Sequence, residues 1–381
     1  MPDIDDVLRQ GIESGAAAGV AAAATTDAGT IYEGAFGVRE LGKPASMTPD
    51  TVVWIASMTK AITAMAAMQL VERGKLSLDE PIGKLLPQLA SPQVFEGYDA
   101  AGKPKLRPAK GAITLRQLLT HTAGFSYDIW NPALGKYMEA TGIPGIISCQ
   151  NAALGTPLTF DPGTRWDYGI NIDWVGKAIE AASGETLDAY MRKNIFEPLG
   201  MSSTSFRLSE EQRSRLSGMH ARGEDGKLAA MPFEIPQEPE FHMGGGGLYG
   251  TVQDYLKFVQ CLLNEGAPLV SRQTFAEMAR NNIGNINVVA LKTAIPPYSA
   301  DADFFPGMSC KWGLSFLINT ATTPQGRSPG SLAWAGLANT FFWADPAKKI
   351  GGVFATQTLP FFDPQVIGLF RDYESAVYRS L

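Results

Sequence analysis

A long uncharged segment near the N-terminus is the feature that most limits how this chain can fold. Across residues 54–70 the only charged side chain is Lys60, and the segment is rich in Ala and Met and contains no Gly or Pro. This composition predicts a helix of several turns. Because apolar residues surround Lys60 on nearly every side, we expect the helix to be buried on most of its faces. Burying an ammonium group is costly, so Lys60 is a candidate functional residue.

Ser57 lies three positions before Lys60, and residues three apart lie on the same face of a helix. A serine hydroxyl is a weak nucleophile until a neighbour takes its proton. A desolvated lysine can take that proton or can lower the pKa of another base. Ser-x-x-Lys is a loose pattern, expected about once by chance in a chain of this size, but its place in an uncharged helix favours a catalytic pair. We therefore interpret Ser57 as an acyl-transfer nucleophile.

The residues around this pair resemble a known family. Residues 50–60 are similar to the active-site segment of the serine β-lactamase and penicillin-binding-protein superfamily, most of all to class C β-lactamases and family VIII carboxylesterases. Residues 113–124, 195–201 and 244–251 are similar to further stretches of that group. The resemblance runs from about residue 5 to the C-terminus. It implies an α/β fold of the serine β-lactamase type, in which helices flank a mixed antiparallel sheet and a mainly helical domain is inserted.

A second motif of that family centres on a tyrosine, and residues 162–176 match it with Tyr168. The resemblance implies that Tyr168 is a proton-transfer partner of Ser57. A phenol held near a lysine ammonium is biased toward phenolate and can act as a general base. Lys60 could instead be the base itself, and the sequence does not choose between the two. Lactamases favour Tyr-x-Asn, whereas Asn171 comes one position late here, which counts against a lactamase.

The third motif of lactamases, Lys-Thr-Gly, is absent from the sequence. Lys292 begins a similar Lys-Thr-Ala, but Ile-Pro-Pro follows and makes a poor strand. A Trp-Ala-Gly motif before a strand-like run fills the position better, and it is the pattern of family VIII esterases. It removes the cation that would hold a β-lactam carboxylate. The resemblance assigns substrate binding to this motif and an oxyanion hole to two backbone N–H groups: Trp334, Ala335 and Gly336 bind substrate, and Ser57 and Leu337 form the oxyanion hole.

Other candidate motifs are weaker. Ser328 satisfies G-x-S-x-G, but Pro and Gly follow it where a nucleophile elbow requires a helix. His121 is the best candidate for a Ser-His-Asp triad, yet its place before Gly124 indicates a structural role in a tight turn. The glycines of residues 244–247 are expected to let the backbone pass close to the site. Three well-separated cysteines and three histidines without ligand spacing indicate no metal, and no cofactor motif is present.

The charge and the N-terminus limit the partners and the compartment. A net charge of −6 and a pI near 5.3 argue against nucleic acid. No run of apolar residues is long enough for a membrane span. The first residues show no secretory signal, and with few cysteines this predicts a cytoplasmic protein. The expected partner is a small-molecule ester, and the oligomeric state stays open.

Strand-like runs near both ends, with helical segments between them, predict two domains. Residues 1–85 and 305–381 are expected to form an α/β domain, and residues 86–304 a mainly helical domain, with the active site in the groove between them. Two Pro-rich loops, residues 231–239 and 295–306, are expected to cover the site. They carry Phe233, Phe304 and Phe305, which would supply an apolar pocket.

These observations predict a serine carboxylesterase that hydrolyses short-chain or aryl esters. Ser57 would form the acyl-enzyme, with Lys60 and Tyr168 as proton-transfer partners. A β-lactamase or D,D-peptidase with the same nucleophile is the nearest alternative. An acyltransferase that passes the acyl group to an alcohol, and a non-catalytic binding protein that keeps the fold, are the others.

Overall fold

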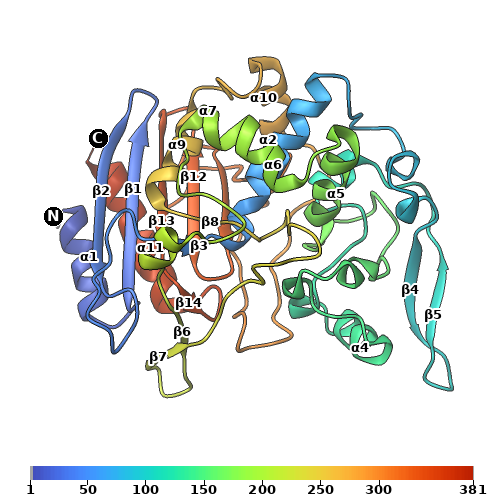
Figure 1. Ribbon diagram of the computed structural model, residues 1–381, viewed down its shortest axis with the longest axis horizontal. Helices are drawn as coiled ribbons and strands as arrows, with labels where there is room; N and C mark the ends of the chain where they lie inside the picture. Colours follow the sequence, from blue (N-terminus) through green and yellow to red (C-terminus); the bar gives the residue numbers. More distant parts are fainter. Residues whose placement is uncertain (1–2, 381) are drawn as a thin grey trace.

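Both ends of the chain build one antiparallel sheet. The computed structural model describes residues 3–380, and its largest sheet has seven strands in the order β2-β1-β13-β12-β11-β10-β9 (Figure 1). The N-terminal hairpin joins the C-terminal strands where β1 pairs with β13. The strands are β1 (Gly19–Thr26), β2 (Thr30–Gly37), β9 (Lys311–Trp312), β10 (Leu317–Ile318), β11 (Leu332–Gly336), β12 (Thr340–Asp345) and β13 (Ile350–Ala355).

Helices cover both faces of this sheet. On one side the terminal helices α1 (Ile4–Glu13) and α11 (Pro364–Arg379) pack together, and on the other α9 (Val252–Leu263) lies against β1, β12 and β13. Successive residues of β12 point to opposite faces. Phe341 stacks on Phe370 of α11 with ring centroids 4.4 Å apart, and Phe342 meets Tyr255 of α9 at 5.1 Å. All residues of β12 and β13 are buried for this reason.

The helix predicted from the uncharged segment is confirmed. α2 (Thr59–Glu72) is buried from Thr59 to Leu70 and packs against α5 (Asn171–Ser183). A turn of 3-10 helix, Ala56–Met58, precedes it, so Ser57 lies just outside the α-helix while Lys60 lies in its first turn. The short pair β3 (Val53–Trp54) and β8 (Tyr249–Gly250) brings the glycine-rich segment beside this turn.

The remaining elements lie outside this sheet, with β4 and β5 on the side of the molecule away from β2 and with β6 and β7 nearer to it (Figure 1). They are α3 (Leu115–Leu119), α4 (Pro132–Thr141), α6 (Leu187–Met191), α7 (Glu197–Leu199), α8 (Glu210–Ser214), α10 (Arg272–Ala279), β4 (Gln93–Tyr98), β5 (Pro104–Pro108), β6 (Met219–Arg222), β7 (Leu228–Met231) and β14 (Thr358–Leu359). Within residues 3–380, no helix combines the length and the apolar character that crossing a membrane requires.

Helix packing links the two predicted domains. α2 belongs to the first predicted domain but packs on α5 of the second, and α9 belongs to the second but covers the sheet of the first. The division of the chain after residues 85 and 304 therefore stays a prediction. What the packing does establish is that α2, which carries Lys60, lies against α5, α6 and α10 of the helical region.

Candidate active site

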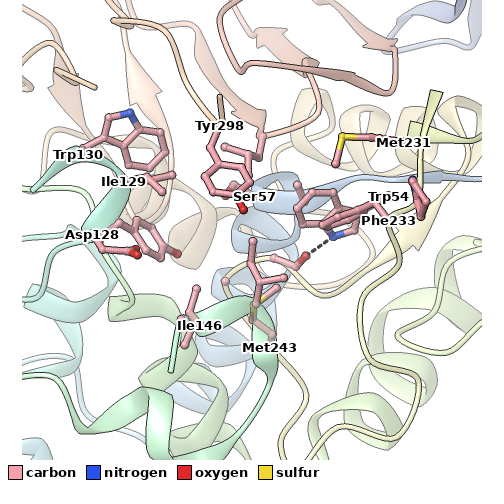
Figure 2. Close-up of a pocket in the computed structure, with 18 residues that line it drawn as sticks. Trp54, Ser57, Asp128, Ile129, Trp130, Ile146, Met231, Phe233, Met243 and Tyr298 are labelled. Atoms are coloured by element: carbon pink, nitrogen blue, oxygen red, sulfur yellow. Dashed lines mark hydrogen bonds between the residues drawn. The ribbon is translucent and has the colours of Figure 1, made fainter. Parts of the chain in front are cut away.

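Ser57 lies on the wall of a cavity of about 440 Å³ (Figure 2). The residue before it, Ala56, has φ 46°, a left-handed conformation that is unfavourable for a side chain with a Cβ. Neighbouring elements hold the turn in place. Thr340 of β12 donates a hydrogen bond to the Ile55 carbonyl oxygen at 3.2 Å, and Tyr255 of α9 donates to the Met58 carbonyl oxygen at 2.8 Å. The position of the serine thus depends on the packing of the sheet and α9 around it.

Lys60 is fully buried and contacts Ser57 directly. Its ammonium group donates to Ser57 Oγ at 3.0 Å, to the Tyr127 hydroxyl at 3.1 Å and to the Gly245 carbonyl oxygen at 2.6 Å. Burial lowers the pKa of Lys60 from its ordinary value of 10.5, and the charge of Asp173 partly opposes this shift. The lysine is therefore easier to deprotonate than an exposed one and lies within proton-transfer distance of the serine.

Asp173 is a charged residue of this site that the sequence analysis missed. It is completely buried in the first turn of α5, and its Oδ1 accepts a hydrogen bond from the Gly245 N–H at 2.8 Å. Burial raises the pKa of Asp173, and Lys60 opposes the rise. A Cβ at position 245 would lie 2.6 Å from Asp173 Oδ2, so a glycine is needed there. The sequence signal that could have indicated Asp173 is a single carboxylate in an otherwise uncharged helical turn.

Tyr168 lies beside Ser57, as the second motif predicted. It is 2% exposed, hydrogen-bonds to Ser57, and accepts a hydrogen bond from Trp334 Nε1 at 2.9 Å. The Lys60 ammonium lies over the phenol ring, 4.7 Å from its centroid. Burial raises the pKa of Tyr168, although the hydrogen bonds to Ser57 and Trp334 oppose this. The expected bias toward phenolate is therefore wrong for this structure, because the loss of solvent around the buried phenol has the largest effect on its pKa.

Tyr127 is a second tyrosine that the sequence analysis missed. Its hydroxyl accepts from Lys60, its ring lies 5.2 Å from that of Tyr168, and it lines the cavity. Burial raises its pKa as well. Tyr127 belongs to no motif recognised in the sequence, so only its position in the fold reveals it.

The third motif lies on β11, against the Ser57 turn. A Cβ at Gly336 would collide with the Ile55 carbonyl oxygen and the Thr340 hydroxyl, which explains the glycine. Leu337, the next residue, lines the cavity together with Ser57. Trp334 is 3% exposed and uses its indole N–H for Tyr168. The oxyanion-hole and substrate-binding roles of these residues stay predictions.

The two Pro-rich loops reach the cavity in part. Met231, Pro232 and Phe233 of the first loop and Tyr298 of the second line it (Figure 2). The expectation for the other two phenylalanines is wrong. Phe304 stacks on Trp334 with centroids 5.1 Å apart, and Phe305 lies near the buried Arg327 guanidinium, so both pack within the scaffold.

His121 and Ser328, the weaker catalytic candidates, are both held by contacts within the fold. His121 is completely buried, and its Nδ1 lies 3.0 Å from Asn171 Nδ2. Its ring packs on Tyr168, and burial lowers its pKa. Ser328 lies in the irregular segment before β11, where its N–H donates to Asp345 Oδ2 at 2.8 Å. Within residues 3–380 no cluster of His, Cys, Asp and Glu side chains could hold a metal ion.

The glycine-rich segment passes close to the site, as expected. Besides the Gly245 carbonyl oxygen that accepts from Lys60, the Gly246 carbonyl oxygen accepts from Trp54 Nε1 at 2.7 Å, and that of Gly244 accepts from the Thr63 hydroxyl at 2.7 Å. The segment therefore connects the two sides of the Ser57 turn through its backbone.

Comparison with known proteins agrees with this geometry. The family model named Beta-lactamase matches residues 4–371. Monacolin J acid methylbutanoyltransferase of Aspergillus terreus is 31% identical over 98% of this chain and 95% of its own. Lovastatin esterase of Penicillium rubens is 29% identical over 99% of this chain and 98% of its own. A mutant of simvastatin synthase (LovD) from Aspergillus terreus superposes with a TM-score of 0.87 at 29% identity, covering 99% of this chain and 94% of that one.

These similar proteins are enzymes, and they include acyltransferases as well as an esterase. The fold described above is the mixed α/β fold of penicillin-binding proteins and serine β-lactamases. The chain belongs to the β-lactamase family.

Proposed function

We propose that this protein is a serine acyltransferase, which forms an acyl-enzyme on Ser57 and passes a short acyl group to the hydroxyl of an apolar small molecule. The observation that carries the proposal is the Lys60–Ser57 hydrogen bond of 3.0 Å on the wall of the cavity. It provides a nucleophile and a base in contact, which acyl transfer requires.

The structure supports Lys60 as the base in the first step. Its pKa is lowered and that of Tyr168 is raised, so the neutral amine is the more accessible basic form. The amine takes the Ser57 proton as Oγ attacks the donor carbonyl. The bond from the carbonyl carbon to the leaving group then breaks, and the proton that Lys60 took passes through Tyr168 to that group. Lys60 is then neutral and Tyr168 protonated again for the second step. The oxyanion would rest on the N–H groups of Ser57 and Leu337.

The second step repeats the first with a different nucleophile. An acceptor hydroxyl attacks the acyl-Ser57 carbonyl, its proton goes to the same base, and Ser57 leaves and recovers its proton. Water in place of the alcohol would give hydrolysis. The choice between transferase and esterase therefore depends on which nucleophile occupies the cavity.

Two observations favour transfer over hydrolysis. The cavity wall is mostly apolar, including Trp54, Ile146, Phe233 and Met243, which favours an apolar alcohol over water. Among the relatives, the methylbutanoyltransferase supports the transfer of a short branched acyl group. The esterase first expected from the sequence becomes the second candidate, and lovastatin esterase is the relative that favours it.

Partitioning of the acyl-enzyme tests this proposal. The protein is incubated with 4-nitrophenyl 2-methylbutanoate and increasing millimolar concentrations of a polycyclic alcohol, and the acid and the transferred ester are quantified by mass spectrometry. We expect the ester to form at the expense of the acid, and Ser57→Ala to form neither. Acid alone at every alcohol concentration would favour the esterase. A lack of any acyl adduct on Ser57 would refute both.

A further inference from the structure

Asp128 is the one charged side chain among the described residues that line the Ser57 cavity. It begins the 3-10 turn Asp128–Trp130, directly after Tyr127, whose hydroxyl accepts from Lys60. The cavity wall bears Asp128 on the same side as Trp130 and opposite Phe233 (Figure 2). Any substrate that reaches Ser57 therefore shares this cavity with a carboxyl group.

Within residues 3–380 no Lys or Arg forms an ion pair with Asp128, although many other carboxylates of the chain are paired. The side chain is partly buried. Burial raises its pKa, and only the backbone N–H groups of Asp128 and Ile129 oppose the rise. A partly desolvated carboxylate without a counter-ion is unfavourable. A ligand that supplies a positive group would recover that free energy.

Aromatic rings add to the attraction at the same place. Trp130 lies T-shaped to Tyr127 with centroids 5.9 Å apart, and both line the cavity with Tyr298. The faces of such rings attract organic cations, most strongly where water is excluded. A carboxylate beside several aromatic rings is a suitable environment for an alkylammonium group.

We propose that Asp128 and the rings of Tyr127, Trp130 and Tyr298 form a subsite for one alkylammonium group on an otherwise apolar substrate, so that the enzyme prefers esters or acceptors with such a group and disfavours anionic ones. The proposal rests on the acyl transfer proposed for Ser57 and specifies the substrate class of that site. Lys60 forms no ion pair with Asp128, because its ammonium group is fully buried and its hydrogen bonds go to Ser57, Tyr127 and Gly245.

Isosteric substrate pairs test the subsite. One pair carries the charge on the leaving group: 3-(trimethylammonio)phenyl acetate and 3-tert-butylphenyl acetate. The other carries it on the acyl group: phenyl 4-(trimethylammonio)butanoate and phenyl 5,5-dimethylhexanoate. For each pair the ratio of kcat/KM, cationic over neutral, is measured in the unaltered protein and in Asp128→Asn. Intrinsic reactivity is the same in both proteins and cancels when the ratios are compared.

We expect the ratio of at least one pair to fall about tenfold or more in Asp128→Asn, the size of one close charge pair in a partly desolvated site. The pair that responds identifies which part of the substrate lies in the subsite. Glu139→Gln, which removes an exposed charge on α4 that has no ion-pair partner among the described residues, is the control for long-range electrostatics and should leave both ratios unchanged. Thermal unfolding of each variant confirms that it is folded.

The outcomes separate this proposal from the proposed function. If the unaltered protein does not turn over the neutral esters, the acyl-transfer assignment fails. If it turns them over but both ratios are the same in Asp128→Asn, or fall equally in Glu139→Gln, the subsite is refuted while acyl transfer stands.

Discussion

At the scale of single residues, the site depends on how charge is balanced around Lys60. Its ammonium group is buried, yet it has three hydrogen-bond acceptors and a buried carboxylate, Asp173, close enough to affect its pKa. An unpaired buried ammonium would be strongly destabilising. The charge of Asp173 thus offsets part of the cost of burying the Lys60 ammonium group. The pKa of Lys60 stays below its ordinary value, so Lys60 can still lose a proton near Ser57.

Asp173→Asn should change the pH dependence of the reaction. The Asp173 charge raises the pKa of Lys60, so its removal should lower that pKa further. If neutral Lys60 is the base, activity rises as Lys60 deprotonates, and the acid limb of the kcat/KM profile should move to lower pH. The measurement is kcat/KM from pH 5 to 10 in both proteins. Movement of the alkaline limb instead would show that the lysine must be charged, with Tyr168 as the base.

The two tyrosines beside Lys60, Tyr168 and Tyr127, should differ in how much they contribute to the rate of acyl transfer. Tyr168→Phe removes the hydroxyl that bonds to Ser57, and we expect acyl transfer to slow by about 10²–10⁴-fold, the usual contribution of a general acid or base. Tyr127→Phe removes one acceptor of Lys60 and should cost only about tenfold, as for one hydrogen bond to a charged group. Single-turnover acylation rates give both values. If Tyr127→Phe slowed acylation more than Tyr168→Phe, Tyr127 rather than Tyr168 would be the residue that transfers the proton.

At the scale of elements, the Ser57 turn is set by the strands and the helix around it. The end of β11 lies directly against Ile55, and Thr340 of β12 and Tyr255 of α9 hydrogen-bond to the turn. The left-handed Ala56 is kept in place by these contacts. The reactivity of the serine is therefore coupled to the packing of β11.

Gly336→Ala should slow acylation of Ser57, because residue 336 lies against the Ile55 carbonyl group. The added methyl group would displace the Ile55 carbonyl and with it the Ser57 turn, so we expect a loss of acylation of at least about tenfold together with a lower Tm. Gly368→Ala in α11 is the matched control, because its Cβ would meet nothing within 4 Å. It should raise stability by about 0.5–1 kcal/mol and leave acylation unchanged. A normal acylation rate in Gly336→Ala would contradict the coupling.

At the scale of the whole molecule, the site is a mainly apolar cavity with a negative group and no cation on its wall among the described residues. Loops, helices and a strand end from distant parts of the chain meet there. In lactamases the Lys-Thr-Gly motif supplies a cation for the substrate carboxylate, whereas Trp334 here is uncharged and buried. The family name therefore does not decide the substrate.

Neutral esters should be preferred over anionic β-lactams for this reason. We expect kcat/KM for phenyl acetate to exceed that for a chromogenic cephalosporin by at least about a hundredfold, which corresponds to nearly 3 kcal/mol of transition-state binding. Both values come from initial rates under one set of conditions. Comparable values would restore the lactamase interpretation.

Local patterns in the sequence were sufficient to predict several elements of the fold. The buried helix α2 and the strand-like runs near both ends of the chain, which pair as β1 with β13, are confirmed by the structure. Each has a periodicity or a composition that its own residues specify. The contact between Ser57 and Lys60 was predicted in the same way, since residues three apart lie close together along a helical turn.

The tertiary structure decided which other residues contact Ser57 and Lys60. Tyr127 lies 67 positions from Lys60 and Gly245 lies 185, and no local pattern relates such positions. The pKa of Tyr168 was misjudged because the sequence shows the nearby lysine but not the extent of burial. The sequence by itself thus determined that Ser57 and Lys60 lie in contact, because helical geometry is local. Only the fold decided the charge balance and the wall of the cavity, because desolvation and contact depend on segments that are distant in the chain.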